Sequence, residues 1–122
     1  MKLTILILLL SLSSCYQAER NCSDYHYGTF ESTITIEGKD FTSIFERNPS
    51  LQIETFEGKT DSSEVRWIND CEVVFRTINP KGMLDKKDIH LKILSTTDST
   101  YTFEYGYIGS PTKQKGIAKR ID

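Results

Sequence analysis

The sequence predicts an all-β fold, an antiparallel meander of about eight short strands that closes into a small barrel. No window of the 122 residues shows a sustained helical period, whereas polar and apolar residues alternate in many segments. Turn-forming residues separate these segments at intervals of about a dozen residues. Eight consecutive strands joined by short connections close most easily into a barrel, because closure removes the unpaired edges of a sheet.

Length and composition allow one folded domain. The chain has 15 Lys and Arg against 17 Asp and Glu, so its formal net charge is -2. Hydrophobic residues make up 38% and charged residues 26%, which is typical of a folded, soluble domain. A large multi-domain enzyme is excluded by length.

The N-terminal segment has the features of an export signal. Lys2 is the only charge before Glu19, and residues 3–12 are mostly apolar. As a helix this run would span roughly 15 Å, about half of a bilayer core, which is too short for a transmembrane anchor. The chain is therefore expected to divide into a signal peptide (1–14), a tether and N-terminal segment (15–27) and a barrel domain (28–122).

The end of this signal resembles the bacterial lipobox. Leu12-Ser13-Ser14-Cys15 has an aliphatic residue, two small residues and a cysteine. The resemblance implies that Cys15 is lipidated and becomes the N-terminus, and two or three acyl chains anchor a protein stably. Tyr16, which is not an aspartate, implies sorting to the outer membrane facing the periplasm. The alternatives are an ordinary secretory signal cut near Ser14, or a buried core segment.

Two further cysteines remain, Cys22 and Cys71. An even pair in an exported chain predicts a disulfide, which would close a loop of about 49 residues. The alternative is two separate, reduced thiols. A catalytic thiol is disfavoured, because the chain has no CxxC motif and neither His26 nor His90 lies in a recognisable partner motif.

The first four strands are expected near residues 28–36, 39–47, 50–57 and 63–68. Alternation is clear where Phe30 and Ile34 are interleaved with polar residues, and again where Ile53 precedes Glu54. The turns that separate these strands are predicted at Glu37-Gly38-Lys39, Asn48-Pro49 and Glu57-Gly58-Lys59. Gly58-Lys59-Thr60 echoes the end of a phosphate-binding P-loop, but the first glycine is missing and no helix follows, so a hairpin turn is favoured.

The last four strands are expected near residues 71–78, 87–95, 100–108 and 113–121. They are separated by Asn79-Pro80-Lys81-Gly82, Thr97-Asp98-Ser99 and Gly109-Ser110-Pro111. One weak helical turn is expected at residues 83–87. A two-residue turn at Asn69-Asp70 would place apolar residues on both faces of its hairpin. Either that hairpin is covered on both sides or a β-bulge resets its register.

The opening of the first strand, Tyr27-Gly28-Thr29-Phe30, resembles the G-x-W opening of lipocalins with Phe in place of Trp. The resemblance implies a lipocalin-like barrel in which the Phe30 ring closes one end and Arg120 packs on it. The chain also resembles small lipoproteins of the Bacteroidetes group. The segments that carry this second resemblance are Gln52-Ile53-Glu54, Trp67-Ile68-Asn69-Asp70-Cys71-Glu72 and Tyr101-Thr102-Phe103-Glu104-Tyr105.

That second resemblance implies no activity. Similar chains sometimes carry a DNA topoisomerase IV label, but a domain of this size cannot supply such a machine. The chain is net acidic, so nucleic-acid binding is not expected.

The candidate ligand-binding residues are aromatic. They are Tyr101, Phe103, Tyr105 and Tyr107 of the seventh strand, together with Trp67. Core packing explains such a stripe, and so does a pocket for a small apolar ligand, because an eight-stranded barrel can either fill with side chains or hold one small ligand. Ser99, in Asp98-Ser99-Thr100, fits a short O-glycosylation signal of exported Bacteroidetes proteins, although a plain turn explains it too.

Other polar residues are expected to be structural. His26 and His90 lack neighbouring ligands at metal-binding spacing. Outward strand positions explain the scattered carboxylates, namely Glu31, Glu54, Glu72 and Glu104. The basic last strand, with Lys113, Lys115, Lys119 and Arg120, is expected to solvate a surface or protect an edge, with contact to anionic headgroups or a partner as the alternative.

Together these features predict a lipid-anchored envelope protein without cofactor or metal. We expect a non-enzymatic binding or accessory module that holds a small apolar ligand or an envelope partner protein. The alternative is a small enzyme with an unrecognised site at the barrel mouth.

Overall fold

The computed structural model describes residues 20–122; the predicted signal peptide and Cys15 fall in 1–19, outside the described residues. Residues 20–122 form eight strands and two 3₁₀ turns. In order, these are η1 (Cys22–Tyr25), β1 (Gly28–Ile36), β2 (Lys39–Arg47), β3 (Leu51–Phe56), β4 (Lys59–Asn69), β5 (Glu72–Thr77), η2 (Leu84–Lys86), β6 (Ile89–Thr96), β7 (Thr100–Tyr107) and β8 (Gln114–Arg120). The all-β prediction is confirmed, although β4 begins earlier than expected.

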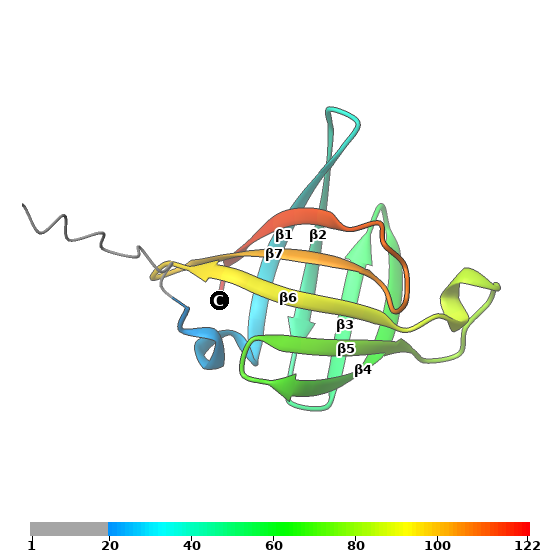
Figure 1. The fold of residues 1–122 in the computed structure, drawn as a ribbon, viewed down its shortest axis with the longest axis horizontal. Helices are drawn as coiled ribbons and strands as arrows, with labels where there is room; N and C mark the ends of the chain where they lie inside the picture. The colour runs from blue at the N-terminus through cyan, green and yellow to red at the C-terminus, as the bar shows by residue number, and fades with distance from the viewer. Residues whose placement is uncertain (1–19) are drawn as a thin grey trace, which may run out of the picture.

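The strands form a closed antiparallel barrel in chain order (Figure 1). β1 closes it by pairing with β8, from Phe30 opposite Arg120 to Ile34 opposite Gly116. The predicted meander and its closure are therefore both confirmed. Within residues 20–122, no helix is long and apolar enough to span a membrane.

Two of the hairpins turn through a pair of residues with positive φ. Glu37 and Gly38 join β1 to β2, and Glu57 and Gly58 join β3 to β4. Positive φ at both central residues is the type I′ geometry, which matches the twist of the flanking strands and favours glycine. Gly58-Lys59-Thr60 is accordingly a hairpin turn, as expected.

A β-bulge resolves the mixed faces of the β4–β5 hairpin. Trp67 pairs with Val73, but the next pair is Asn69 with Glu72, so Ile68 is left over and is 55% exposed. The turn therefore lies one residue later than predicted. The bulge returns Trp67 and Val73 to the interior face. Val74 points outward and is still buried, in a shallow hollow that is also lined by Arg66, Arg76 and Ile108.

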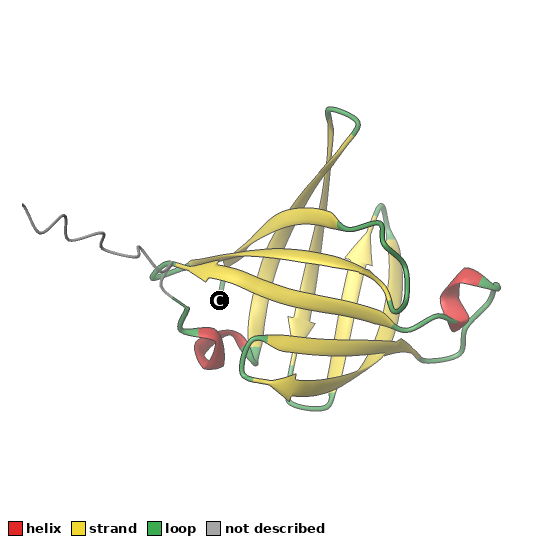
Figure 2. Cartoon of the chain, in the orientation of Figure 1, coloured by secondary structure: helices red, strands yellow, loops and turns green. Residues whose placement is uncertain are grey.

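The core occupies the barrel interior and continues into η1. Its buried members are Cys22, Tyr25, Phe30, Phe45, Val65, Val73, Phe75, Leu91, Ile93, Tyr101, Phe103 and Ala118. Figure 2 shows η1 and η2 outside the sheet, at opposite ends of the barrel. We call the end where η1 packs the closed end. The open end is the one reached by the β1–β2, β3–β4, β5–β6 and β7–β8 connections.

Candidate functional site

The closed end is filled by side chains around a buried arginine. Arg47 is only 3% exposed, and its guanidinium lies 5.0 to 5.9 Å from the centroids of five aromatic rings. It donates hydrogen bonds to the Tyr25 carbonyl (2.9 Å), the Tyr101 hydroxyl (3.1 Å) and the Gln52 side chain (2.8 Å). The electron-rich ring faces and these acceptors stabilise a cation that has no carboxylate partner within residues 20–122.

The Phe30 and Arg120 arrangement implied by the lipocalin resemblance is present at this end. Phe30 is fully buried, and the Arg120 guanidinium lies 5.1 Å from the centroid of its ring. Arg120 also donates to the backbone carbonyls of Asp24 and Tyr27, so it ties η1 to the barrel. Gly28 has φ +137°, and a Cβ there would lie 2.5 Å from an Arg120 nitrogen, so glycine provides both the conformation and the space.

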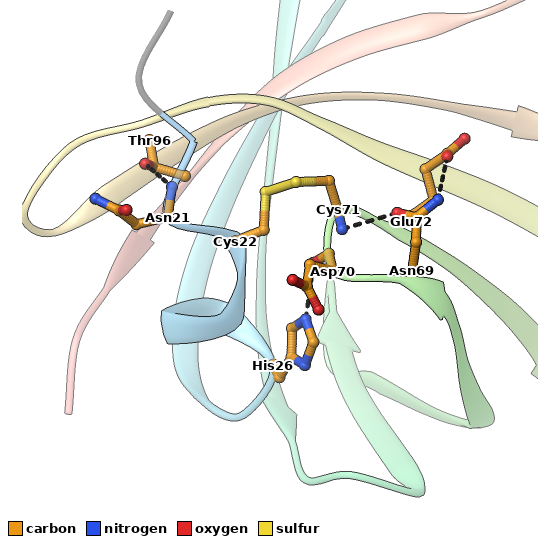
Figure 3. The surroundings of a disulfide bond; sticks show 8 residues. All are labelled: Asn21, Cys22, His26, Asn69, Asp70, Cys71, Glu72 and Thr96. Carbon is orange, nitrogen blue, oxygen red and sulfur yellow. Dashed lines mark hydrogen bonds between the residues drawn. A yellow bond between two sulfur atoms is a disulfide. The ribbon is translucent and has the colours of Figure 1, made fainter.

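The disulfide fastens η1 to the β4–β5 turn (Figure 3). Cys22 and Cys71 are bonded, with 5.1 Å between their Cα atoms. The Asn69 side chain accepts a hydrogen bond from the Cys71 N–H (3.0 Å), which shapes the turn that presents this cysteine. His26 stacks on Trp67 at 3.8 Å between ring centroids. The pairing of the two cysteines is thus the predicted one.

The open end contains a cavity. A space of about 170 Å³ lies inside the barrel, on the open-end side of the buried aromatic residues. Phe103 and Tyr105 of β7 contribute to its lining. A second space of about 290 Å³ adjoins it toward the tips of the β1–β2 and β3–β4 hairpins. Both spaces are lined by Ile34, Glu54 and Tyr105, so they adjoin each other, and we refer to them together as the hollow.

Strand pairing explains where the hollow reaches the surface. The β2–β3 ladder ends where Ile44 pairs with Thr55. β2 nevertheless continues its pairing with β1 as far as Lys39, and β3 continues with β4 as far as Phe56. The two hairpins therefore separate beyond this point, and Phe41 and Phe56 lie across the separation with their ring centroids 6.3 Å apart.

The two walls of the inner cavity differ in chemistry. β3 and β4 contribute only polar residues, as two cross-strand pairs, Gln52 with Ser63 and Glu54 with Asp61. The opposite wall, from β1, β6 and β7, is mainly apolar. Its apolar and aromatic members are Ile34, Ile89, Leu91, Tyr101, Phe103 and Tyr105.

Glu54 points into the barrel, so the outward position predicted for it is wrong. Its neighbour Ile53 instead lines a hollow on the outer surface. Burial raises the pKa of the Glu54 carboxyl, and the nearby Asp61 acts in the same direction. The Ser43 hydroxyl donates to Glu54 Oε2 at 3.0 Å, which partly opposes that shift. Glu31, Glu72 and Glu104 do point outward, as expected from their neighbours' burial.

The structure divides the predicted aromatic stripe into three parts. Tyr101 is buried at the closed end, and Phe103 is buried one step further along β7 toward the open end. Tyr105 lines both cavities. Burial, and then the negative charge of Glu54, raise the pKa of the Tyr105 hydroxyl. Tyr107 lies beyond the cavity, with Lys87 Nζ 5.7 Å from its ring centroid. Tyr107 instead lines a separate hollow with Arg76 and Lys87, and ligand binding by this residue stays a prediction.

Trp67 also lies outside the pocket. Its ring contacts His26 and the Arg47 guanidinium at the closed end, and its buried indole N–H has no hydrogen-bond partner among the described residues. Trp67 lies beside η1 near the β4–β5 turn and does not line the open-end cavity, and ligand binding by this residue stays a prediction.

The remaining predicted positions lie on the surface. Ser99 is exposed in the β6–β7 turn, and its modification stays a prediction. His90 lies 3.0 Å from Glu72 Oε1, and hydrogen bonds from Asn69 and His90 hold the pKa of Glu72 below its usual range. His26 hydrogen-bonds to the Asp70 carbonyl. In the part of the chain from residue 20 onward, no group of three or more His, Cys, Asp or Glu side chains could hold a metal ion.

Comparison with known proteins identifies the architecture. No protein family model matches the sequence, and no curated protein does. The chain is similar to a solved structure described as a redesigned β-barrel, with a TM-score of 0.53 and 13% sequence identity. The match covers 87% of this chain and 100% of that one. At this identity the similarity shows the barrel fold alone.

Sequence reasoning missed the residues that make the cavity polar. Glu54 and Asp61 each lie in an expected or observed strand, but alternation alone does not say which face of a strand points into the barrel. One signal was present, because Gln52, Glu54, Asp61 and Ser63 flank a tight turn at matching distances. Cross-strand neighbours of this kind share one face of a hairpin.

Proposed function

We propose that this protein is a lipid-anchored binding protein of the cell envelope, which holds a small, largely apolar ligand in the open end of its barrel. The observation that carries the proposal is the hollow shared by Ile34, Glu54 and Tyr105, in a barrel whose other end is filled by side chains. A small barrel with unfilled interior space can hold one small ligand. No catalytic step is part of this proposal.

Probe binding and ligand extraction test the pocket. A neutral apolar dye such as N-phenyl-naphthylamine should bind the purified protein, and organic extraction should release a co-purifying apolar compound. Ile34 lines both spaces, so Ile34→Trp should fill the hollow and abolish dye binding. Tyr105→Ala should weaken dye binding roughly tenfold, because it removes an aromatic ring that lines both spaces of the hollow.

Tyr27→Ala is the matched control, because the Tyr27 side chain is 63% exposed and lies outside both cavities. It should leave dye affinity unchanged. Retention of full dye affinity by folded Ile34→Trp protein would move the site elsewhere.

The proposed anchor is tested separately. Radiolabelled palmitate should be incorporated into the wild-type protein and into Cys22→Ser, and should be lost from Cys15→Ser. The Cys22 variant is the control, because it removes a cysteine without touching the lipobox. A soluble, unlabelled wild-type product would contradict the anchor without affecting the proposed pocket.

A further inference from the structure

The open-end cavity carries negative charge that the protein does not balance. Glu54 and Asp61 face each other across the β3–β4 hairpin and line the inner space together. Within residues 20–122, neither carboxylate takes part in a salt bridge. In the described part of the chain, Glu54 is hydrogen-bonded only to the Ser43 hydroxyl, and burying an ionised carboxylate without a cation is unfavourable.

Among the described residues, Arg47 is the only Lys or Arg that lines either space. Arg47 lines the floor of the inner space, but the guanidinium is surrounded by aromatic rings and donates to Gln52, Tyr25 and Tyr101. Lys39, at the tip of the β1–β2 hairpin, lies 5.5 Å from the Phe41 ring centroid and lines neither space. The lining of the inner space therefore holds two carboxylates against one guanidinium, so its net charge is negative.

The surroundings of the carboxylates determine the rest of the ligand. Gln52 and Ser63 extend the polar wall from these carboxylates toward the closed end. Ile34, Leu91 and Tyr105 belong to the facing apolar wall. A ligand that satisfies both walls has a hydrogen-bond-donating, positively charged group on one side and a hydrocarbon body on the other. A purely apolar ligand would leave Glu54 unpaired, and an anionic one would be repelled.

We infer that the cavity is selective for amphipathic amines, with the ammonium group held by Glu54 and Asp61 and the hydrocarbon body packed against Ile34, Leu91 and Tyr105. This rests on the proposed function, because it assigns a ligand class to the same hollow. Charge-assisted hydrogen bonds to Glu54 would supply the selectivity, and the apolar wall would supply most of the remaining affinity.

Three probes of equal chain length separate this inference from the proposed function. Calorimetric titration of the purified protein near neutral pH should show octylamine binding roughly tenfold to a hundredfold more tightly than octanol, and octanoate weakest. Octanol binding as tightly as octylamine would overturn the amine selectivity and leave the pocket intact. If none of the three binds, both proposals fail.

Variants then locate the selectivity. Glu54→Gln keeps the shape of the side chain and should remove most of the preference for octylamine, with octanol affinity nearly unchanged. Asp61→Asn should have the same effect to a smaller extent, because Asp61 is the more exposed carboxylate. Glu31→Gln is the control, since Glu31 lies on the outer face of β1 and should leave the preference unchanged. A preference that survives in Glu54→Gln contradicts the inference.

The pH dependence of binding gives an independent readout. The groups that face Glu54 are Asp61 from β4 and Tyr105 from β7, with Arg47 from β2 on the same cavity floor. Burial raises the pKa of the Tyr105 hydroxyl further above the neutral range, so Tyr105 keeps its proton at and below neutral pH. Octylamine affinity should therefore fall on acidification as Glu54 is protonated, while octanol affinity stays constant. Octylamine affinity that is independent of pH would contradict the inference.

Discussion

The two ends of the barrel are built from the same eight strands but are filled in opposite ways. At the closed end, η1, the Cys22–Cys71 bond and a cage of rings around Arg47 leave the interior packed with side chains. At the open end, the β1–β2 and β3–β4 hairpins separate and the interior is hollow. Stability is therefore concentrated at the closed end, and the residues at the open end are available to a ligand.

The difference originates in which side chains each strand turns inward. β7 turns Tyr101 and Phe103 into the interior, where Tyr101 packs on both Phe30 and Phe103. β3 directs Gln52 and Glu54 inward, and these polar side chains do not fill space as aromatic rings do. The fold tolerates a buried carboxylate at the mouth because the other end supplies most of the packing, a division often seen between scaffold and binding site.

The disulfide at the closed end should give the largest effect on stability. A double Cys22→Ser, Cys71→Ser variant should lose about 4 kcal/mol of unfolding free energy, because the bond closes a loop between residues 49 apart in sequence. Urea unfolding of the oxidised protein and the variant measures this directly. Equal unfolding midpoints for the two proteins would show that the disulfide does not contribute to the stability of the fold.

Arg47 should give the next largest effect. Arg47→Ala removes three hydrogen bonds and opens a space among five rings, so a loss of about 3 kcal/mol is expected. Arg47→Met keeps much of the packing and should lose less. Chemical denaturation of both variants tests the order, and an alanine variant as stable as wild type would refute the structural role of the cage.

The smallest effect on stability is expected from Glu54→Gln at the open end. This substitution should raise the free energy of unfolding at neutral pH, whereas the two closed-end substitutions lower it. Burial raises the pKa of Glu54, so its contribution to stability is fully present below the pKa of an unfolded glutamate. That contribution is lost as pH rises through the higher folded-state value. Glu54→Gln should therefore be neutral at acid pH and modestly stabilising at neutral pH.

Denaturation across this pH range tests the sign, with Glu31→Gln on the outer face as the control. A Glu54→Gln variant that is destabilised at neutral pH would mean that the buried carboxylate contributes to stability.

The strands and their order could be predicted from the sequence, because alternation and turn residues are local signals. Phe30 and Arg120 could also be placed, since they follow from the opening motif and the last strand. The β4–β5 bulge was one of two predicted outcomes, and it is present between Trp67 and Asn69.

The site could be predicted only in part, because it depends on which face of each strand is inside and on height along the barrel. The alternation of Ile53 and Glu54 fits either face, and the closure of the barrel, not the local pattern, turns Glu54 inward. Tyr105 and Tyr107 share one face, yet the β7–β8 ladder ends at Tyr105, and of the two only Tyr105 lines the cavity. Trp67 also faces the interior, but it lies next to the β4–β5 turn and therefore at the closed end of the barrel.

A two-dimensional NMR titration of the purified protein with octylamine tests the contrast between the two ends most directly. Resonances of Ile34, Glu54 and Tyr105 should shift in a saturable way, whereas those of Tyr25 and Phe30 should stay in place. Saturable shifts concentrated at Tyr25 and Phe30, with the open-end resonances unchanged, would contradict the assignment of binding to the open end and of structural support to the closed end.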